Sequence, residues 1–527
     1  MSGIIKLFRS GELIGETEGI PGETLLARIS AAGVFLDAPC GGQGKCGKCL
    51  VRLAPDSEPV LACKTHVEGD MDIYLPDEME MKIADSGKQV LGGADAGKEE
   101  KGETREDRAA DWIGHRIGVA VDIGTTSVVA HLTDMDTGER IATASGVNAQ
   151  RPYGADVISR IQYSADNGHE ALTRLIREQL SKLMLDACAS SGVKVENIEY
   201  ISIAANTIME HLAAGYSPVG MGVVPFTTVS LFGDEMAAGA DLPVARDATL
   251  YFAPAISAYV GGDITAGMLA AGLEDMQGPV VYLDIGTNGE IALKQGDKYY
   301  CCATAAGPAF EGAEITMGMA AVNGAINHVK WDGGLELSVV GGQTPRGLCG
   351  SGLLDALAVL LETGAVDETG RLLDPEEISH EIAAHIGVAD GKNAFMLTGD
   401  NSVYMTASDI RKLQLAKSAI AAGIQTLIRH IGIAEDGVTQ FILAGGFGSF
   451  MDQYSAARIG LFPSGFLPVA KTLGNTAGEG AAIALCSAQA RAALESIRNR
   501  CEYIELSTSP VFNEQFVEQM MFPGEEV

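Results

Sequence analysis

The sequence predicts a multidomain α/β protein, and three features of the chain support this fold class. With 527 residues, the chain exceeds the size at which a single hydrophobic core keeps growing. Strands alternate with helices from residue 117 to about residue 500, a pattern typical of α/β domains. Within this region, GVAVDIGTTSVVAHL (118–132) is similar to VVYLDIGTNGEIALK (280–294). We therefore expect two lobes with a similar arrangement of strands.

Composition divides the chain into five segments. Residues 1–84 alternate short strands and turns around one helix, and residues 85–116 are rich in Gly, Lys and Glu and are predicted to be a flexible charged linker. The first lobe, with a middle region, is predicted over 117–278 and the second lobe over 279–500. Residues 501–527 form a C-terminal tail, which we expect to pack back on the second lobe.

The first segment contains a predicted hairpin. Ile4–Phe8 and Glu12–Glu16 are predicted strands on either side of Ser10-Gly11, which suits a tight turn. A helix is predicted over Leu25–Ala32, and a further strand over Asp70–Leu75. These elements predict a small domain of strands around one helix.

The chain is strongly acidic, with 37 basic and 69 acidic side chains and a net charge of −32. This charge argues against nucleic acid and anionic membranes as partners, because both attract cationic surfaces. The excess of acidic side chains either keeps the protein soluble or provides a docking surface for a basic partner protein. No run of about 18 apolar residues occurs, and Gly352–Val366, which carries Asp355 and Glu362, is predicted to be an amphipathic helix. The N-terminus lacks the apolar core of a signal peptide, so we expect a soluble, cytoplasmic protein.

Four cysteines in the first segment predict a 2Fe–2S cluster. Cys40, Cys46, Cys49 and Cys63 have the spacing Cys-x5-Cys-x2-Cys-x13-Cys, and four thiolates are what such a cluster needs. The glycines between them allow a tight loop whose amides face sulfur, and two lysines can offset negative charge: Gly41, Gly42, Gly44, Gly47, Lys45 and Lys48. Structural zinc is the competing metal, but it usually takes paired Cys-x2–4-Cys knuckles. The spacing resembles that of adrenodoxin-type ferredoxins, which implies a β-grasp fold.

The remaining cysteines are predicted to be reduced core or surface thiols. Cys301 and Cys302 lie in a strand-like run, and the others are isolated. A second cluster at Cys301, Cys302 or Cys349 in a dimer interface is the alternative.

Three glycine-containing turns predict a nucleotide site. Asp-Ile-Gly-Thr-Thr (122–126) ends an apolar strand, so its amides and hydroxyls can donate to phosphate oxygens. Asp-Ile-Gly-Thr-Asn (284–288) repeats this arrangement, and Phe441–Gly448 is an apolar strand ending in a glycine-rich turn that can approach adenosine. The predicted nucleotide contacts are Gly124, Thr125, Thr126, Gly286, Thr287, Asn288, Gly445, Gly446, Phe447 and Gly448. Asp122 and Asp284 are predicted to hold Mg²⁺. No Walker-type P-loop sequence is present.

The order of these turns resembles the phosphate-1, phosphate-2 and adenosine motifs of the superfamily of actin, sugar kinases, acetate kinase and chaperone ATPases (ASKHA). This resemblance implies a two-lobed ATPase. It also implies that Asp263, in Tyr259-Val-Gly-Gly-Asp, stands where sugar kinases have a catalytic acid or base, beside the γ-phosphate. The alternative is that Asp263 caps the helix that starts at Ile264.

Nearly the whole chain resembles the reductive activators of corrinoid proteins. The resemblance rests on NAQRPYGADVISRI (148–161), IAANTIMEHLAAG (203–215), SAYVGGDITAG (257–267), AGPAFEG (306–312), GLCGSGLLDALA (347–358), SDIRKLQLAK (408–417), NTAGEGA (475–481) and EYIELS (502–507). It implies an ATP-dependent iron–sulfur enzyme of anaerobes that returns inactive Co(II) to Co(I) in a corrinoid protein of a methyltransferase system. The implied partners are that protein and an upstream electron donor. Assembly of the chain into a homodimer is left open.

Two other functions remain open from the sequence. The first is a small-molecule kinase of the ASKHA fold with a regulatory ferredoxin domain, which would yield a phosphorylated product. The second is an electron carrier whose ATPase lobes only mediate assembly. No histidine stands in the Asp-x-His-x-x-Gly motif of a base-off corrinoid site, so the corrinoid must belong to the partner.

Overall fold

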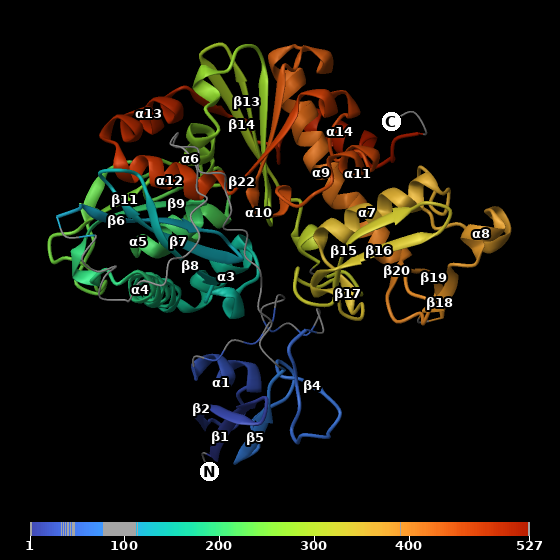
Figure 1. Cartoon of the computed structure of the whole chain (residues 1–527), viewed down its shortest axis with the longest axis horizontal. Helices are drawn as coiled ribbons and strands as arrows, with labels where there is room; N and C mark the ends of the chain where they lie inside the picture. The colour runs from blue at the N-terminus through green and yellow to red at the C-terminus, as the bar shows by residue number, and fades with distance from the viewer. Residues whose placement is uncertain are drawn as a thin grey trace.

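The computed structural model describes residues 3–32, 34, 36, 38, 42, 44, 48–76, 112, 114–312, 314–389 and 391–524 (Figure 1). Cys40 and Cys46, and most of the predicted linker, lie outside the described residues. In the part of the chain that the structure describes, no helix is long and apolar enough to cross a membrane.

The N-terminal region is a small sheet with one helix. Its strand order is β2-β1-β5, with β1 antiparallel to β2 and parallel to β5. The elements are β1 (Gly3–Arg9), β2 (Glu12–Gly19), α1 (Leu25–Ala31), β3 (Leu50–Val51), β4 (Val60–Leu61) and β5 (Met71–Tyr74). The hairpin turn at Ser10 and Gly11 has positive φ at both residues, as expected for a two-residue connection. The Thr24 side chain caps α1 by accepting a hydrogen bond from the Ala27 amide.

The first-lobe sheet has the strand order β10-β11-β9-β6-β7-β8. Its strands are β6 (Ile117–Ile123), β7 (Ser127–Asp134), β8 (Arg140–Val147), β9 (Ile198–Ala205), β10 (Glu235–Ala237) and β11 (Thr249–Phe252). Helices α3 (Val157–Asn167), α4 (Glu170–Ser191) and α5 (Thr207–Ala214) pack against one face. The other face, with Ala120 and Ala204, packs against the helices between the lobes: α6 (Gly262–Ala270), α12 (Thr476–Cys486) and α13 (Ala488–Asn499).

The second-lobe sheet has the strand order β22-β21-β12-β13-β14-β23. Its strands are β12 (Val280–Ile285), β13 (Gly289–Gln295), β14 (Lys298–Thr304), β21 (Gln440–Ala444), β22 (Ala470–Gly474) and β23 (Cys501–Tyr503). In both sheets an antiparallel meander (β6-β7-β8 or β12-β13-β14) is extended by a parallel strand, β9 or β21. The internal repeat therefore corresponds to two sheets with the same central arrangement.

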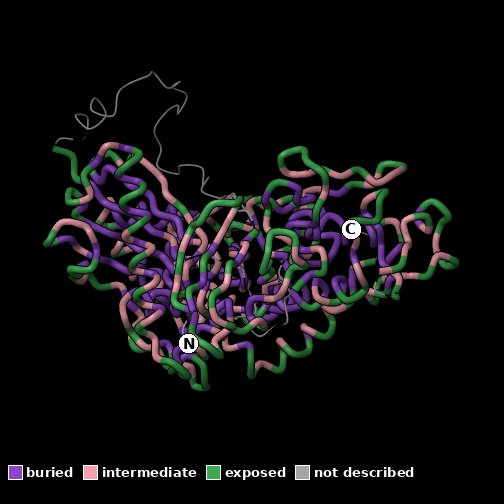
Figure 2. Tube along the Cα trace, turned by 90° about the horizontal axis from the view of Figure 1, so that it is seen from below, coloured by how far each residue is buried: buried purple, intermediate pink, exposed green. Residues whose placement is uncertain are grey.

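Helix α6 lies between the two sheets. Its Ala266 packs with the first-lobe sheet, while Ile264 and Met268 pack with Tyr282 of the second. The central strands of each sheet are buried on both faces, which explains why β6 and β12 are nearly continuous apolar runs. Figure 2 shows buried residues in the interior of the molecule and exposed residues at the periphery.

Further elements complete the second lobe. They are β15 (Ala325–Trp331), β16 (Leu335–Val339), β17 (Gly347–Leu348), α7 (Gly350–Glu362), α8 (His380–Ala383), β18 (Ile386–Ala389), β19 (Lys392–Met396), β20 (Tyr404–Thr406), α9 (Ala407–Ile431), α10 (Gly445–Gly448), α11 (Gln453–Arg458) and α14 (Pro510–Glu518). The amphipathic character predicted for the helix at Gly352–Val366 is wrong. Residues 350–361 of α7 are all buried, because β15 covers one side of the helix and α11 lies against another, and Asp355 Oδ2 lies 2.9 Å from His328 Nδ1.

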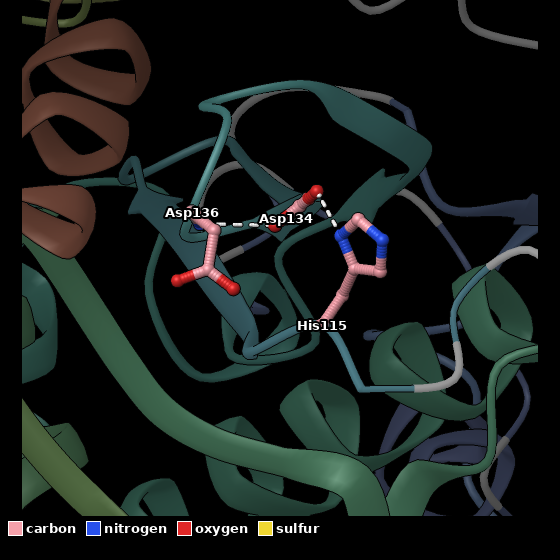
Figure 3. A group of neighbouring side chains, drawn as sticks. All are labelled: His115, Asp134 and Asp136. Carbon is pink, nitrogen blue, oxygen red and sulfur yellow. Dashed lines mark hydrogen bonds and ion pairs between the residues drawn. The ribbon is translucent and has the colours of Figure 1, made fainter.

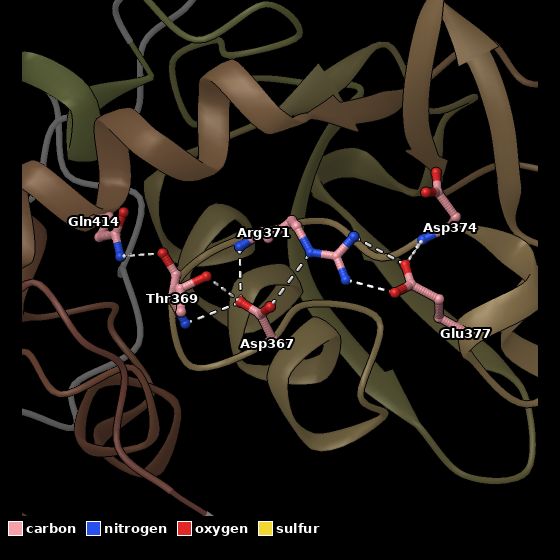
Figure 4. A network of polar contacts seen from close by, with 6 residues as sticks. All are labelled: Asp367, Thr369, Arg371, Asp374, Glu377 and Gln414. Atoms are coloured by element: carbon pink, nitrogen blue, oxygen red, sulfur yellow. Dashed lines mark hydrogen bonds and ion pairs between the residues drawn. The ribbon is translucent and has the colours of Figure 1, made fainter.

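A polar network stabilises the segment between α7 and α8 (Figure 4). Asp367 accepts hydrogen bonds from the backbone and side chain of Thr369 and from the Arg371 amide. Arg371 makes a paired contact with Glu377, and Gln414 of α9 donates to the Thr369 carbonyl. The segment is thereby held on α9.

The C-terminal residues lie on the second lobe. Strand β23 pairs in parallel with β14, and α14 packs against α9. Side chains of α9 then donate to backbone carbonyls of the tail: Gln414 to Met520 and Lys417 to Met521.

Candidate functional site

The two Asp-Ile-Gly-Thr turns meet between the lobes. One turn joins β6 to β7 and the other joins β12 to β13. The hydroxyl oxygens of Thr126 and Thr287 are 3.4 Å apart, although these residues belong to different lobes. The structure therefore brings both predicted phosphate turns to one place.

Polar side chains from neighbouring elements fix the first turn. Asn148 donates to the Gly124 carbonyl at 2.8 Å, and Asn206 donates to the Thr125 hydroxyl at 3.2 Å. Arg160, fully buried, donates to the Thr125 carbonyl at 2.5 Å. Burial and the charge of Arg151 lower the Arg160 pKa to about 9. Sequence reasoning assigned no role to these supporting residues, although they lie in the runs that carry the family resemblance.

Three predicted carboxyl groups, Asp122, Asp263 and Asp284, interact electrostatically in one site, and each residue is partly buried. Burial raises the pKa of Asp122 to about 7; the hydrogen bond from Asn475 at 2.9 Å opposes this shift and the charge of Asp284 adds to it. Burial and the charges of Asp284 and Asp122 raise the Asp263 pKa to about 8. Burial raises the Asp284 pKa to about 6, which the hydrogen bond from Tyr282 opposes.

This donor set fits a divalent cation. The oxygens of carboxylates are the ligands that Mg²⁺ prefers, and carboxyl groups that repel one another in a buried site are stabilised in their charged form by a cation. The carboxylates predicted to hold Mg²⁺ belong to the second-to-last residues of the apolar strands β6 and β12, which places them next to the phosphate turns.

Two further acidic residues surround this group. Neither carboxyl oxygen of Glu210 has a hydrogen-bond partner among the described residues, and its pKa is raised by burial and then by the charge of Asp263. The Glu290 pKa is raised by burial and by Asp263 and Asp284. Each of these glutamates stands inside a mainly apolar run, Glu210 in residues 208–212 and Glu290 in residues 289–293. An acidic residue in such a run is a sign of a functional site, but our sequence analysis did not use it.

Asp263 lies in the first turn of α6. The residue before the helix is Gly261, so Asp263 is not the helix cap itself, although its carboxylate accepts a hydrogen bond from the Ile264 amide at 2.9 Å. The alternative that Asp263 is the N-cap is therefore wrong, although Asp263 does bind the Ile264 amide. The charges of Asp122 and Asp284 act on Asp263, so the three carboxyl groups belong to one site.

The third predicted motif borders the same site. Gly445, Gly446, Phe447 and Gly448 form α10 directly after β21. Gly445 has φ +87°, and a Cβ at this position would lie 2.4 Å from Asp284 Oδ1, so only glycine suits it. For Gly446 and Gly448, no heavy atom of the described residues lies within 4 Å of an added Cβ.

Glu311 contacts both phosphate turns. Thr126 donates to Glu311 Oε2 at 3.0 Å, and Thr287 donates to Glu311 Oε1 at 2.6 Å. Glu311 lies in the AGPAFEG run (306–312), which carried the family resemblance without any assigned role. Next to it, the Phe310 ring stacks on Phe447 with centroids 5.5 Å apart.

The described half of the predicted cluster site lies at the β3–β4 pair. Cys49 directly precedes β3, Cys63 follows β4, and the Ala62 amide donates to the Cys49 carbonyl at 2.8 Å. Both thiols are buried and not in disulfides. Cys49 and Cys63 thus flank one strand pair, which fits ligands of one cluster.

The alternative of a second cluster in a dimer interface is wrong. Cys301, Cys302 and Cys349 are buried within the subunit, so an interface between copies cannot reach them. Cys301 instead donates to Cys501 Sγ at 3.8 Å, from strand β14 to β23.

A second polar group lies where the chain enters the first lobe (Figure 3). Ligand atoms of His115, Asp134 and Asp136 lie within 4.8 Å of one another. However, Asp134 already accepts from the Asp136 amide at 2.9 Å and the Thr137 hydroxyl at 2.9 Å, and lies 2.7 Å from His115 Nδ1. These contacts satisfy the carboxylate as a turn-forming group.

Comparisons with known proteins agree with this geometry. A family model described as "C-terminal domain of RACo the ASKHA domain" matches residues 279–527, and one described as "RACo middle region" matches residues 117–276. The "Corrinoid activation enzyme RamQ" of Eubacterium limosum is 31% identical over 97% of this chain and 98% of its own length. The chain belongs to the family of reductive activators of corrinoid proteins. The resemblance stated from the sequence, the mixed α/β class and the ASKHA assignment are thereby confirmed.

Two other relatives extend the comparison. The "[Co(II) methylated amine-specific corrinoid protein] reductase" of Methanosarcina barkeri is 26% identical, over 68% of this chain and 68% of its own. A solved structure named "Reductive activator for corrinoid,iron-sulfur protein" is 28% identical, with a TM-score of 0.70 and coverage of 99% of both chains. The similarity to this activator therefore extends over the N-terminal region as well as the lobes.

Proposed function

We propose that this activator is an enzyme that uses ATP to return a corrinoid protein from Co(II) to Co(I) by one-electron transfer. The observation that carries the proposal is the meeting of Thr126 and Thr287 at 3.4 Å, in a chain similar over nearly its full length to a corrinoid activation enzyme. A single ATP can be held from both lobes there. We further propose that the partner belongs to a cytoplasmic methyltransferase system of an anaerobe and that a separate protein donates the electron.

The nucleotide is proposed to lie across the three motifs. Gly124, Thr125 and Thr126 would face its terminal phosphates from one lobe and the turn at 286–288 from the other, while residues 445–448 would border adenosine. Asp122 and Asp284 would hold Mg²⁺, which offsets the charge of the phosphates during transfer.

Asp263 is proposed to orient or deprotonate the water that attacks the γ-phosphate. Its raised pKa, about 8, lies in the range where a carboxylate can accept a proton near neutral pH. The packing of α6 between both sheets would fix its position relative to the phosphate turns.

The electron is proposed to come from a 2Fe–2S cluster held in an N-terminal β-grasp domain by Cys40, Cys46, Cys49 and Cys63. When bound, the cluster supplies one electron at a time. The buried, reduced thiols of Cys49 and Cys63 at one strand pair support this assignment. Each 59 mV of uphill potential lowers the equilibrium yield about tenfold, so transfer to a colder cobalt needs an added driving force. ATP is proposed to supply that force.

The test mixes reduced full-length protein, Mg-ATP and a Co(II) corrinoid protein and follows the Co(I) absorption band. Cys46→Ser should abolish the band, whereas Asp122→Ala should remove only its dependence on ATP. Cys486→Ser and Asp136→Ala, which change the same residue types outside the proposed site, serve as controls and should behave as wild type. Equal Co(I) formation with and without ATP would refute the coupling.

A further inference from the structure

The carboxylate of Glu311 bridges the two lobes at the phosphate turns. Its Oε2 accepts from Thr126 at 3.0 Å and its Oε1 accepts from Thr287 at 2.6 Å. A planar anion with two oxygens thus engages one hydroxyl from each lobe. A phosphate group presents the same chemistry, which is an anion whose oxygens accept hydrogen bonds.

Glu311 and a nucleotide phosphate cannot use these hydroxyls together. Each threonine hydroxyl has one proton to donate, and two anions at hydrogen-bond distance from the same pair of donors repel each other. Resting on the proposed function, we propose that Glu311 competes with the terminal phosphates of ATP and that its displacement is transmitted to the docking site of the N-terminal region.

The route of transmission is the loop that follows Glu311. Gly312 and Gly318 pack backbone against backbone, since a Cβ added at Gly318 would lie 2.1 Å from the Gly312 carbonyl oxygen. Gly318 also forms a bridge with Leu348, directly before α7. Because no side chain separates these glycines, a displacement beside Glu311 must move Gly318 or break the contact.

Gly318 in turn contacts Lys48, a residue of the N-terminal region. Lys48 Nζ donates to the Gly318 carbonyl at 2.8 Å, and in sequence Lys48 lies between two predicted cluster ligands, Cys46 and Cys49. In Figure 1 the N-terminal strands β1, β2 and β5 lie below the two lobes. The phosphate turns, Glu311, Gly318 and Lys48 thus form one series of contacts.

Helix α9 holds the loop at two places: Lys412 donates to the Glu314 carbonyl, and Asp409 binds Thr316. Asp409 of α9 accepts from the Thr316 amide at 2.8 Å and from its hydroxyl at 3.0 Å. A displaced Glu311 therefore reorients the loop around these two contacts. Phe310, stacked on Phe447 beside the proposed adenosine site, gives the nucleotide a second contact with the same loop.

The first experiment measures nucleotide affinity of the full-length protein by calorimetry. Glu311→Gln keeps the shape of the side chain and removes its charge, so Mg-ATP should bind about tenfold more tightly, the factor for about 1.4 kcal/mol. Adenosine, which has no phosphate, should bind with unchanged affinity. Glu314→Gln makes the same change at an exposed position of the same loop and should leave both affinities within twofold of wild type. Unchanged or weaker Mg-ATP binding by the Glu311→Gln variant would overturn the proposal.

The second experiment follows amide hydrogen exchange of the same full-length protein. Mg-ATP should alter exchange in residues 314–319 and 48–52, and Glu311→Ala should produce the same change without nucleotide. Changes confined to the turns at 122–126 and 284–288 would overturn the transmission step. Neither experiment contains a corrinoid protein. Failure of the wild type to bind ATP would refute the proposed function, whereas normal ATP binding with no effect of Glu311 would refute this inference alone.

Discussion

Gly445→Ala is the substitution whose effect the structure defines most sharply. Gly445 joins β21 to α10 with φ +87°, a conformation that L-residues rarely adopt. An added Cβ would lie 2.4 Å from Asp284 Oδ1 and 2.6 Å from the Ile285 carbonyl oxygen. Asp284 is partly buried, Ile285 is fully buried, and both belong to the second phosphate turn, so relief of the clash must move either the turn or the glycine-rich segment.

The expected cost has two parts. A positive φ costs a residue with a side chain about 1–2 kcal/mol relative to glycine, and overpacking of a dense site costs about 1–3 kcal/mol. Together these give about 2–5 kcal/mol in the free energy of unfolding of the second lobe. For a unit of this size, such a loss lowers the midpoint of thermal unfolding by on the order of 10 °C.

Thermal unfolding and Mg-ATP titration of the purified variant measure both consequences. Gly446→Ala is the matched control, because no heavy atom of the described residues lies within 4 Å of its added Cβ and its φ is not positive. It should unfold within about 2 °C of wild type. If Gly445→Ala unfolds at the same temperature as Gly446→Ala, the reasoning from backbone conformation and close approach is wrong.

Two further predictions concern protons. Asn475→Ala removes the hydrogen bond that lowers the Asp122 pKa, so this pKa should rise above about 7. The affinity for Mg-ATP at pH 7 should therefore fall about tenfold and recover at higher pH. Calorimetry from pH 6.5 to 9 checks this expectation, and an unchanged pH profile of the affinity would contradict it. Burial lowers the Lys417 pKa to about 7, whereas an unfolded lysine titrates at about 10.4. Between these two pKa values the unfolded chain binds more protons than the folded protein, so the free energy of unfolding rises with pH. Below pH 7 Lys417 is charged in both states, and its destabilising effect on the fold is complete. Lys417→Met should flatten the dependence of the unfolding midpoint on pH between 7 and 9.5, and equal slopes for both proteins would refute the assignment.

The sequence was most informative where chemistry depends on local spacing. The two Asp-Ile-Gly-Thr turns, the glycine-rich third motif and the repeated strand arrangement could all be predicted, because a strand followed by a tight turn is determined by a few neighbouring residues. The resemblance to the corrinoid activators came from longer runs of the same kind. Residues whose role depends on a distant partner could not be found in this way: Asn475 reaches Asp122, and Asn206 reaches Thr125, only after the lobes have folded.

The sequence by itself determined which segments could bind a phosphate and which four cysteines could hold a cluster, because glycine freedom and thiolate spacing are properties of short stretches of chain. Only the tertiary structure decided that Thr126 and Thr287 meet, that Asp263 joins Asp122 and Asp284 in one site, and that Glu311 lies between the two turns. Their proximity depends on two similar sheets packing around α6. Packing of apolar faces, unlike turn geometry, leaves no record in the spacing of the residues that it brings together.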